Sequence, residues 1–153
     1  MKKLIILIAA VLLTVGTAGY IMYMKTVDTE YAIGFAEAFQ NYDINTVDEY
    51  FSVDTVFEFN GTRKKYKELR SNIKKACNEK LYEFSSGSSY GHGNDKFING
   101  VQTVKIMLSG RIRGEDFGDC VVIMKLKRTG MFSFSVESVK CDEAVFGELF
   151  FQS

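Results

Sequence analysis

The only histidine of this chain, His92, is a first candidate for acid–base chemistry. His92 stands in the stretch SSGSSYGHGND, residues 85–95, where serines and glycines surround it. A catalytic histidine usually needs a partner that fixes its tautomer, and Asp95 is close enough in the sequence to serve. A glycine-rich stretch holds geometry poorly, however, so we interpret His92 as the solvated tip of a loop.

A second set of candidates combines carboxylates with tyrosines. A carboxylate base needs an apolar cavity that tunes its pKa and a proton donor beside it. Asp54, Glu58, Tyr31 and Tyr50 have the right chemistry. Each also has a simpler interpretation: Asp54 suits a helix-to-strand turn, Glu58 alternates with phenylalanines and so points to solvent, and both tyrosines fit apolar faces. We therefore assign no catalytic residue.

The three cysteines, Cys77, Cys120 and Cys141, match no metal motif, and there is no second histidine to complete a site. We expect them to be small buried side chains, and we expect no metal and no cofactor. The alternative is one disulfide between Cys120 and Cys141. In an exported protein, an odd number of cysteines leaves at least one thiol outside any disulfide within the chain.

The N-terminus carries the strongest single signal. Residues 4–24, LIILIAAVLLTVGTAGYIMYM, contain no charge, and as a helix they cover about 30 Å, the thickness of a bilayer core. Lys2 and Lys3 precede this run, so the positive-inside rule places the N-terminus in the cytoplasm and the remaining chain outside it. We expect residues 1–25 to be a signal anchor; the alternative is a signal peptide cleaved after GTA, which gives a secreted protein. Both alternatives export the domain at residues 26–153.

Helices come first in the exported part. Residues 28–41 have apolar side chains at helical spacing, with Asp28 or Thr29 as the cap, beyond a short hinge at residues 25–29. A short helix follows within residues 43–52, capped by Asn45 or Thr46. After a strand that ends at the Asn60-Gly61 turn signal, residues 62–80 predict a long amphipathic helix.

The opposite face of that long helix is basic. Nineteen basic residues balance nineteen acidic ones over the whole chain, so the net charge does not favour nucleic acid. We interpret the basic face as an ordinary solvated face, partly neutralised by the acidic helices before it. The alternative is that a basic face beside a membrane binds anionic lipid head groups or cell-wall polymers. Its candidate residues are Arg63, Lys64, Lys67, Arg70 and Lys74.

Strands dominate the rest of the chain. A short strand near residues 81–86 precedes the serine-glycine stretch, and three longer strands occupy residues 97–141. Val139 and Cys141 fall out of phase with the alternation before them, which predicts a bulge. The segment EAVFGELFF closes the chain as a short strand or docking tail. Helices followed by strands indicate an α+β domain, with the helices packed on one face of an antiparallel sheet.

This order of elements resembles the nuclear transport factor 2-like superfamily over residues 28–150. The resemblance rests on FAEAFQNYDINTVDEYFSVDTVFEFNG, with its aromatic pair Tyr50-Phe51, and on RTGMFSFSVESVKCDEAVFG. It implies a cystatin-like cone, in which a curved sheet wraps around helices and leaves a pocket at its wide end. Members are enzymes, small-ligand binders or protein-binding domains, and many pair through the outer face of the sheet. The residues expected near such a pocket are Tyr31, Phe35, Tyr50, Asp54, Phe57, Glu58 and His92.

Because no motif has catalytic spacing, we favour a membrane-tethered, extracytoplasmic, non-catalytic binding or protein-interaction domain in a bacterial envelope. One alternative is an isomerase- or cyclase-like enzyme that acts on a small apolar ligand in the pocket. Another is a purely structural partner, which would expose an apolar sheet face. The expected partners are the membrane, a second copy or another envelope protein, and a small apolar ligand; nucleic acid is not expected.

Overall fold

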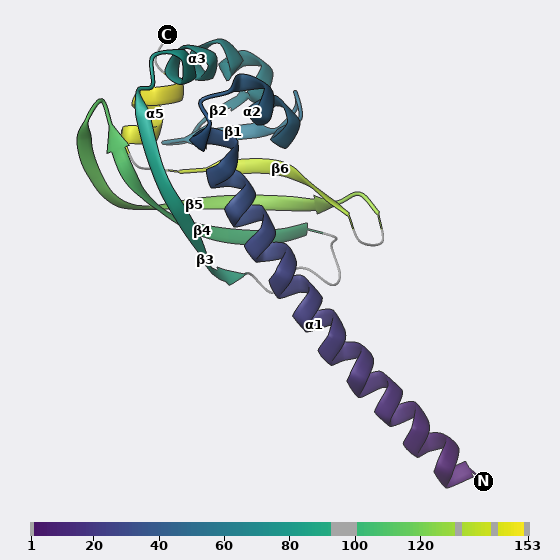
Figure 1. The fold of residues 1–153 in the computed structure, drawn as a ribbon. Coiled ribbons are helices and arrows are strands. Elements are labelled where there is room, and N and C mark those ends of the chain that lie inside the picture. Colours follow the sequence, from purple (N-terminus) through teal and green to yellow (C-terminus); the bar gives the residue numbers. More distant parts are fainter. Residues whose placement is uncertain (1, 93–100, 131–132, 142–143, 152–153) are drawn as a thin grey trace.

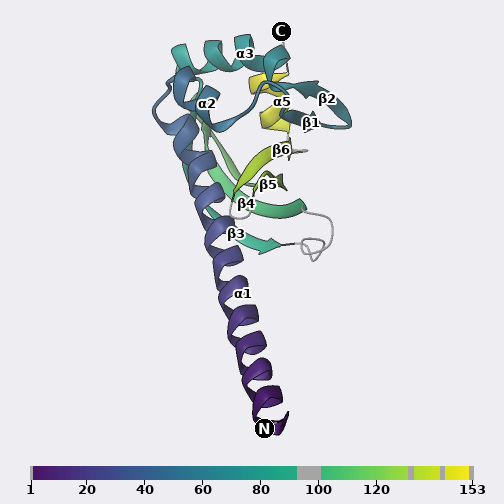
Figure 2. The same ribbon diagram turned by 90° about the vertical axis from the view of Figure 1, so that its right-hand side faces the viewer.

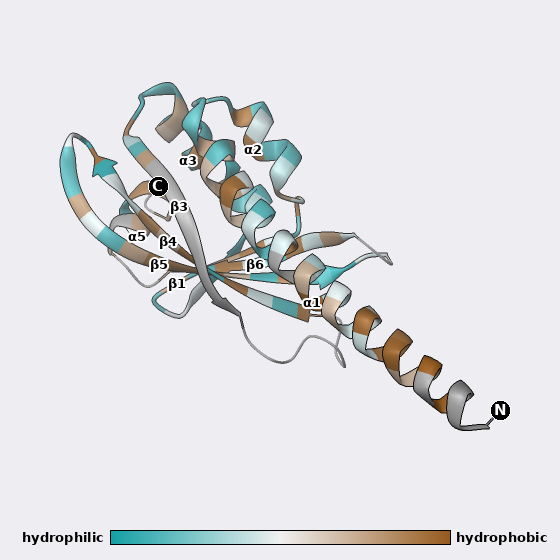
Figure 3. Cartoon of the chain, turned by 60° about the horizontal axis from the view of Figure 1, so that its bottom comes forward, coloured by the Kyte–Doolittle hydropathy of each residue, from teal (hydrophilic) through white to brown (hydrophobic). Residues whose placement is uncertain are grey.

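One long N-terminal helix joins an α+β domain in the computed structural model, which describes residues 2–92, 101–130, 133–141 and 144–151 (Figure 1). Helix α1, Lys2–Gln40, has an apolar first half that projects away from the domain (Figures 2 and 3). The elements that follow are α2 (Ile44–Tyr50), β1 (Val56–Phe59), β2 (Thr62–Lys65), α3 (Tyr66–Asn78), β3 (Tyr82–His92), β4 (Val101–Ile112), β5 (Glu115–Arg128), β6 (Phe134–Lys140) and α5 (Ala144–Phe150).

The continuity of α1 corrects the predicted hinge at residues 25–29. That segment contains neither proline nor glycine, so nothing in it interrupts the hydrogen bonds of a helix. Asp28, a predicted cap, lies instead within α1 and is only 7% exposed. Its carboxylate accepts a hydrogen bond from the side-chain amide of Gln102 on β4, which fastens α1 to the sheet.

A six-stranded sheet in the order β2-β1-β6-β5-β4-β3 forms the other layer. Its neighbouring strands are antiparallel, except that β1 and β6 run parallel. Parallel neighbours need a long crossover, and here α3 and four strands, β2 to β5, make that connection. Helix α1 crosses one face of the sheet, while α2, α3 and α5 gather at the end far from the N-terminus (Figures 1 and 2). The α+β class predicted from the sequence is confirmed.

The predicted helix over residues 62–80 begins later than expected. Asn60 and Gly61 both have positive φ, 45° and 77°, which favours a tight hairpin turn between β1 and β2. Residues 62–65 therefore pair with β1 as an edge strand, and α3 starts at Tyr66. As a result Arg63 and Lys64 lie on a strand and not on the basic face of a helix.

The short helix α2 is capped by Asp43, whose side-chain carboxylate accepts a hydrogen bond from the backbone N–H of Asn45, and not by Asn45 or Thr46.

The serine-glycine stretch around His92 is predicted to be a loop, and this prediction is also wrong. Strand β3 continues through it to His92, whose backbone pairs with Val104, so His92 is not the tip of a loop. Register shifts between Ser85 and Ser88, and between Ser89 and His92, accommodate the irregular stretch within the sheet. The side chain of His92 and all of Asp95 lie outside the described residues.

Two further details concern the C-terminal part. The predicted bulge is confirmed: Leu126 faces Val136 and Lys125 faces Ser138, which leaves Glu137 as the extra residue of β6. The final segment is not a strand; it docks on the core as helix α5, which buries Phe146 and Phe150 at helical spacing. All three cysteines are buried thiols, as favoured over a disulfide.

Aromatic rings fill the space between the helices and the sheet. The ring centroids of Phe35 and Phe39 on α1 are 5.3 Å apart, and Phe39 lies 5.5 Å from Phe150 of α5. Phe51, which follows α2, lies 5.1 Å from Phe57 of β1. The exposed fraction of each of these side chains is 2% or less. The interior is therefore a packed core, in which tilted and edge-on ring pairs add to the burial of apolar area.

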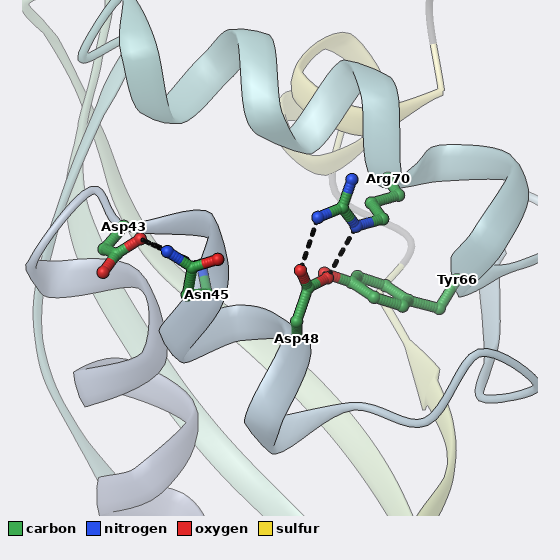
Figure 4. Close-up of polar contacts among 5 residues, drawn as sticks. All are labelled: Asp43, Asn45, Asp48, Tyr66 and Arg70. Carbon is green, nitrogen blue, oxygen red and sulfur yellow. Dashed lines mark hydrogen bonds and ion pairs between the residues drawn. The ribbon is translucent and has the colours of Figure 1, made fainter.

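Asp48 ties α2 to α3 at the edge of this core (Figure 4). Its carboxylate accepts hydrogen bonds from Arg70 Nε at 2.8 Å, Arg70 Nη2 at 2.5 Å and the Tyr66 hydroxyl at 2.7 Å. The Arg70 guanidinium holds the pKa of Asp48 below its usual value. Burial and the hydrogen bond to Asp48 raise the pKa of Tyr66. The sequence places these residues far apart, so only the docking of α3 on α2 brings them together.

We expect Asp48→Asn to lower the melting temperature of the full chain by about 2–4 °C at pH 7, because it removes a two-point ion pair that is only partly exposed. A lowered pKa stabilises the fold above the pKa of the unfolded state, and this contribution is lost as pH falls through the folded pKa. The difference in melting temperature between wild type and variant should therefore shrink below about pH 4. Circular dichroism melts at pH 7 and pH 3 measure it.

The matched control is Asp54→Asn, since Asp54 is an exposed carboxylate bonded to Lys65 at 2.8 Å. Equal effects of the two substitutions, or a difference for Asp48→Asn that persists at pH 3, would contradict a specific role for the Asp48 tie.

Candidate functional site

A groove of about 560 Å³ lies between α1, α2 and β6. We call it the α1–α2 groove. Its apolar wall consists of aromatic rings and Val136, and its rim carries carboxylates. The residues that line it are Glu30, Tyr31, Asp48, Glu49, Tyr50, Phe51, Ser52, Phe134, Ser135 and Val136.

Two tyrosines hold the walls of this groove together. The Tyr31 hydroxyl donates to the backbone carbonyl of Phe134 at 2.6 Å, which joins α1 to the start of β6. The Tyr50 hydroxyl donates to the carbonyl of Tyr31 at 2.5 Å, and it lies 3.6 Å from the sulfur of Met124. Burial raises the pKa of Tyr50, so this hydroxyl remains protonated and keeps its hydrogen bond. Both tyrosines therefore position backbone and do not serve as bases.

The carboxylates of the groove have different surroundings. Glu30 and Glu49 are exposed on the rim, where water solvates them. Asp48 is held ionised by Arg70, and its lowered pKa makes it a weak base. Within the described part of the chain, no group of three or more His, Cys, Asp or Glu residues could hold a metal ion.

The structure brings together two of the seven residues predicted to lie near a pocket, Tyr31 and Tyr50. Phe35 and Phe57 are both completely buried in the aromatic core, and the groove does not reach them. Glu58 on β1 lies between two cations, 3.5 Å from Arg63 and 3.2 Å from Lys140.

The other two predicted pocket residues also lie away from the groove. Asp54 is exposed and bonded to Lys65, and the backbone of His92 ends strand β3. In the strand order β2-β1-β6-β5-β4-β3, β1 is the neighbour of β6 and none of its residues lines the groove, while β3 is the edge strand three places from β6.

The predicted basic face is divided between two elements. Arg63 pairs with Glu58, Lys64 lies 5.7 Å from the ring centroid of Phe151, and Arg70 binds Asp48. Lys67 and Lys74 are exposed on α3. Figures 1 and 2 show α3 at the end of the domain far from the N-terminus of α1, so these cations do not face the side on which the apolar half of α1 leaves the domain.

Sequence analysis did not identify Phe134, Ser135 and Asp48 as residues of a site. Phe134 and Ser135 begin β6, and their place in the groove depends on the hydrogen bond from Tyr31, 103 residues away. Asp48 has the appearance of an ordinary acidic residue in the first turn of a short helix. No sequence pattern near these residues predicts any of these contacts.

The groove depends on a glycine of α1. A Cβ atom at Gly34 would lie 2.8 Å from Cε2 of the Tyr50 ring, so Gly34→Ala must displace that ring. We expect this substitution to lower the free energy of unfolding by about 1–3 kcal/mol, the usual effect of overpacking. It should also weaken the near-UV circular dichroism of the tyrosines, since the chain contains no tryptophan.

Gly19→Ala in the same helix is the control, because a Cβ atom there meets nothing within 4 Å. Urea unfolding of both variants in detergent micelles measures the difference. Equal stability of the two would show that Tyr50 does not depend on the close approach of Gly34.

Comparisons with known proteins add information on the fold. No family model matches the chain, and no curated protein does. Among solved structures, an NTF2-like protein of unknown function from Shewanella oneidensis is 13% identical, with a TM-score of 0.57 over 84% of this chain and 99% of that one. A cystatin-like domain of unknown function from Nostoc punctiforme is 12% identical, with a TM-score of 0.60 over 77% and 75%.

A third similar structure is an enzyme. An LEH-like epoxide hydrolase from M. tuberculosis is 19% identical, with a TM-score of 0.51 over 79% of this chain and 90% of that one. At these identities the similarity establishes a shared architecture and not a shared chemistry. The chain therefore has the fold of the nuclear transport factor 2-like superfamily, as its sequence predicts.

Proposed function

We propose that this chain is a non-catalytic protein-binding domain, tethered by the first half of α1 to the outer face of a bacterial cell membrane. The observation that most strongly supports a binding role is the packed interior. Buried phenylalanines of α1, β1 and α5 fill the space in which a cone-shaped domain would otherwise hold a substrate. The α1–α2 groove lies outside that core and presents structural tyrosines, not a tuned acid or base.

The tether is supported by the exposure of α1. One helix of the described chain is long and apolar enough to cross a membrane. Ile6, Leu12, Leu13 and Met22 on it are 68–72% exposed, so nothing in the described part of the domain covers them. A long apolar helix without such cover favours a lipid environment. Lys2 and Lys3 then favour the orientation with the domain outside the cytoplasm.

The lining of the groove suggests the chemistry of its partner. Phe134, Val136 and the tyrosine rings offer an apolar wall, and Glu30 and Glu49 add negative charge at the rim. This combination fits a segment of another envelope protein that carries apolar and basic side chains. An isomerase- or cyclase-like enzyme is the alternative, and it would require a small ligand within the domain.

Tethering is tested by expressing the full chain with a C-terminal tag in a bacterial host. We expect the chain to stay in the membrane pellet during carbonate extraction, and the tag to be digested by protease added to intact spheroplasts. Release by carbonate would contradict the tether, and a protected tag would contradict the orientation.

Partner binding is tested by placing a photo-cross-linking residue at Ser135 and identifying cross-linked proteins by mass spectrometry. Glu49→Lys should reduce the yield of the cross-linked partner several-fold, because it reverses a charge of the rim. Glu37→Lys is the matched control, since Glu37 is exposed on α1 and does not line the groove.

Native mass spectrometry of the same preparation separates the alternatives. A reproducible small added mass would favour the enzyme or ligand-binding alternative. A dimer without cross-links at Ser135 would favour pairing with a second copy, and either result would contradict a protein-binding groove.

A further inference from the structure

The C-terminal end of β5 contacts α1 outside the core of the domain. Arg128 Nη2 donates a hydrogen bond to the Tyr20 hydroxyl of α1 at 2.8 Å, and its guanidinium lies 5.6 Å from the ring centroid of Phe134. Val27, which is 4% exposed, marks where α1 enters the core. Seven helical residues separate Tyr20 from Val27, which is about 10 Å. The end of β5 thus extends well beyond the core toward the N-terminus of α1.

Tyr20 has a defined depth if α1 crosses a membrane. The apolar run starts at Leu4, and a hydrocarbon core of about 30 Å accommodates about twenty helical residues, which ends the span near Tyr23. Tyrosine rings prefer the boundary between hydrocarbon and head groups. Tyr20 lies about 4.5 Å inside that end of the span, so its hydroxyl and the Arg128 side chain bound to it lie close to the boundary between hydrocarbon and head groups.

Charge is distributed unevenly along β5 in a way that matches this placement. Glu115, Asp116 and Asp119 stand in its first residues, and Lys125, Lys127 and Arg128 in its last. All six are exposed. Nine residues separate Asp119 from Arg128, about 30 Å along an extended strand. The cationic end lies toward the tether and the anionic end away from it, the arrangement of lower energy beside an anionic surface.

We propose that Lys127 and Arg128 at the end of β5 bind the phosphate groups of the phospholipids that surround α1, and so hold the domain in a fixed orientation on the membrane. This inference rests on the proposed tether. Arg128 is positioned by Tyr20 and Phe134, and Lys127, the preceding residue, is exposed on the opposite face of the strand end. Helix α3 and its cations belong to the end of the domain far from the N-terminus of α1 (Figures 1 and 2).

A fluorescent reporter tests the contact in the full chain. The chain has no tryptophan, so Thr129→Trp places a single indole next to Arg128. The protein is incorporated into nanodiscs of phosphatidylglycerol or phosphatidylcholine whose acyl chains are brominated near the head group. We expect about twofold stronger quenching in phosphatidylglycerol, and loss of the difference in 0.5 M sodium chloride, where charges are screened within a few ångströms.

Two substitutions assign the effect to these cations. Lys127→Glu should abolish the difference between the two lipids, and Arg111→Glu at the other end of the sheet, exposed on β4, should leave it unchanged. Arg128→Lys should retain most of the difference and Arg128→Gln should reduce it, which separates charge from the packing on Phe134. A tryptophan at Val53, exposed between α2 and β1, should not be quenched in either lipid.

Other outcomes overturn the proposal. Equal quenching in both lipids, or no quenching at Thr129→Trp in a chain that co-elutes with the nanodiscs, would show that β5 does not bind anionic head groups. Displacement by inorganic phosphate, beyond that by sodium chloride of equal ionic strength, would assign the cations to a soluble anion. A chain that does not enter nanodiscs would contradict the tether itself.

Discussion

The continuity of helix α1 is the constraint on which the remaining structure depends. A single helix, Lys2–Gln40, carries an exposed apolar half and a half that packs against the sheet through Phe35 and Phe39. Because an uninterrupted helix is stiff, the direction of its apolar half fixes the direction of the half that packs on the sheet, and with it the orientation of the domain. The buried hydrogen bond between Asp28 and Gln102 and the contact of Arg128 with Tyr20 both act on this helix. A flexible hinge at residues 25–29 would have removed that coupling.

Packing of the core decides what kind of site the domain can offer. Helix α5 inserts Phe146 and Phe150 between α1 and the sheet, where they contact Phe35 and Phe39. Because aromatic side chains pack closely in this interior, polar groups that could contact a ligand lie at the surface of the domain. The α1–α2 groove is therefore a surface feature, built by two tyrosine hydroxyls that satisfy backbone carbonyls. The proposed binding role rests on this arrangement.

The charged residues show which features of the surface the sequence predicts and which it does not. The concentration of acidic residues before Asn60 and basic residues after it is plain in the sequence, yet its most basic segment lies at the end of the domain far from the apolar half of α1. Part of that charge is used internally, in the Arg70–Asp48 and Arg63–Glu58 pairs. Proximity in sequence to the apolar half of α1 did not predict proximity in space to it, because the second half of α1 carries the chain some 20 helical residues away before α3 begins.

The sequence by itself determined the apolar helix, the α+β class, the bulge of β6 and the burial of the cysteines, since each follows from a local periodicity or composition. Tertiary structure alone decided the parallel pairing of β1 with β6, the conversion of residues 62–65 into an edge strand and the docking of α5. It also decided the site: Tyr31 and Tyr50 come together with Phe134, while Phe35 and Phe57 enter the core. These outcomes depend on contacts between residues that are distant in sequence. A local sequence pattern does not show which distant residues will meet, or how strongly they will interact.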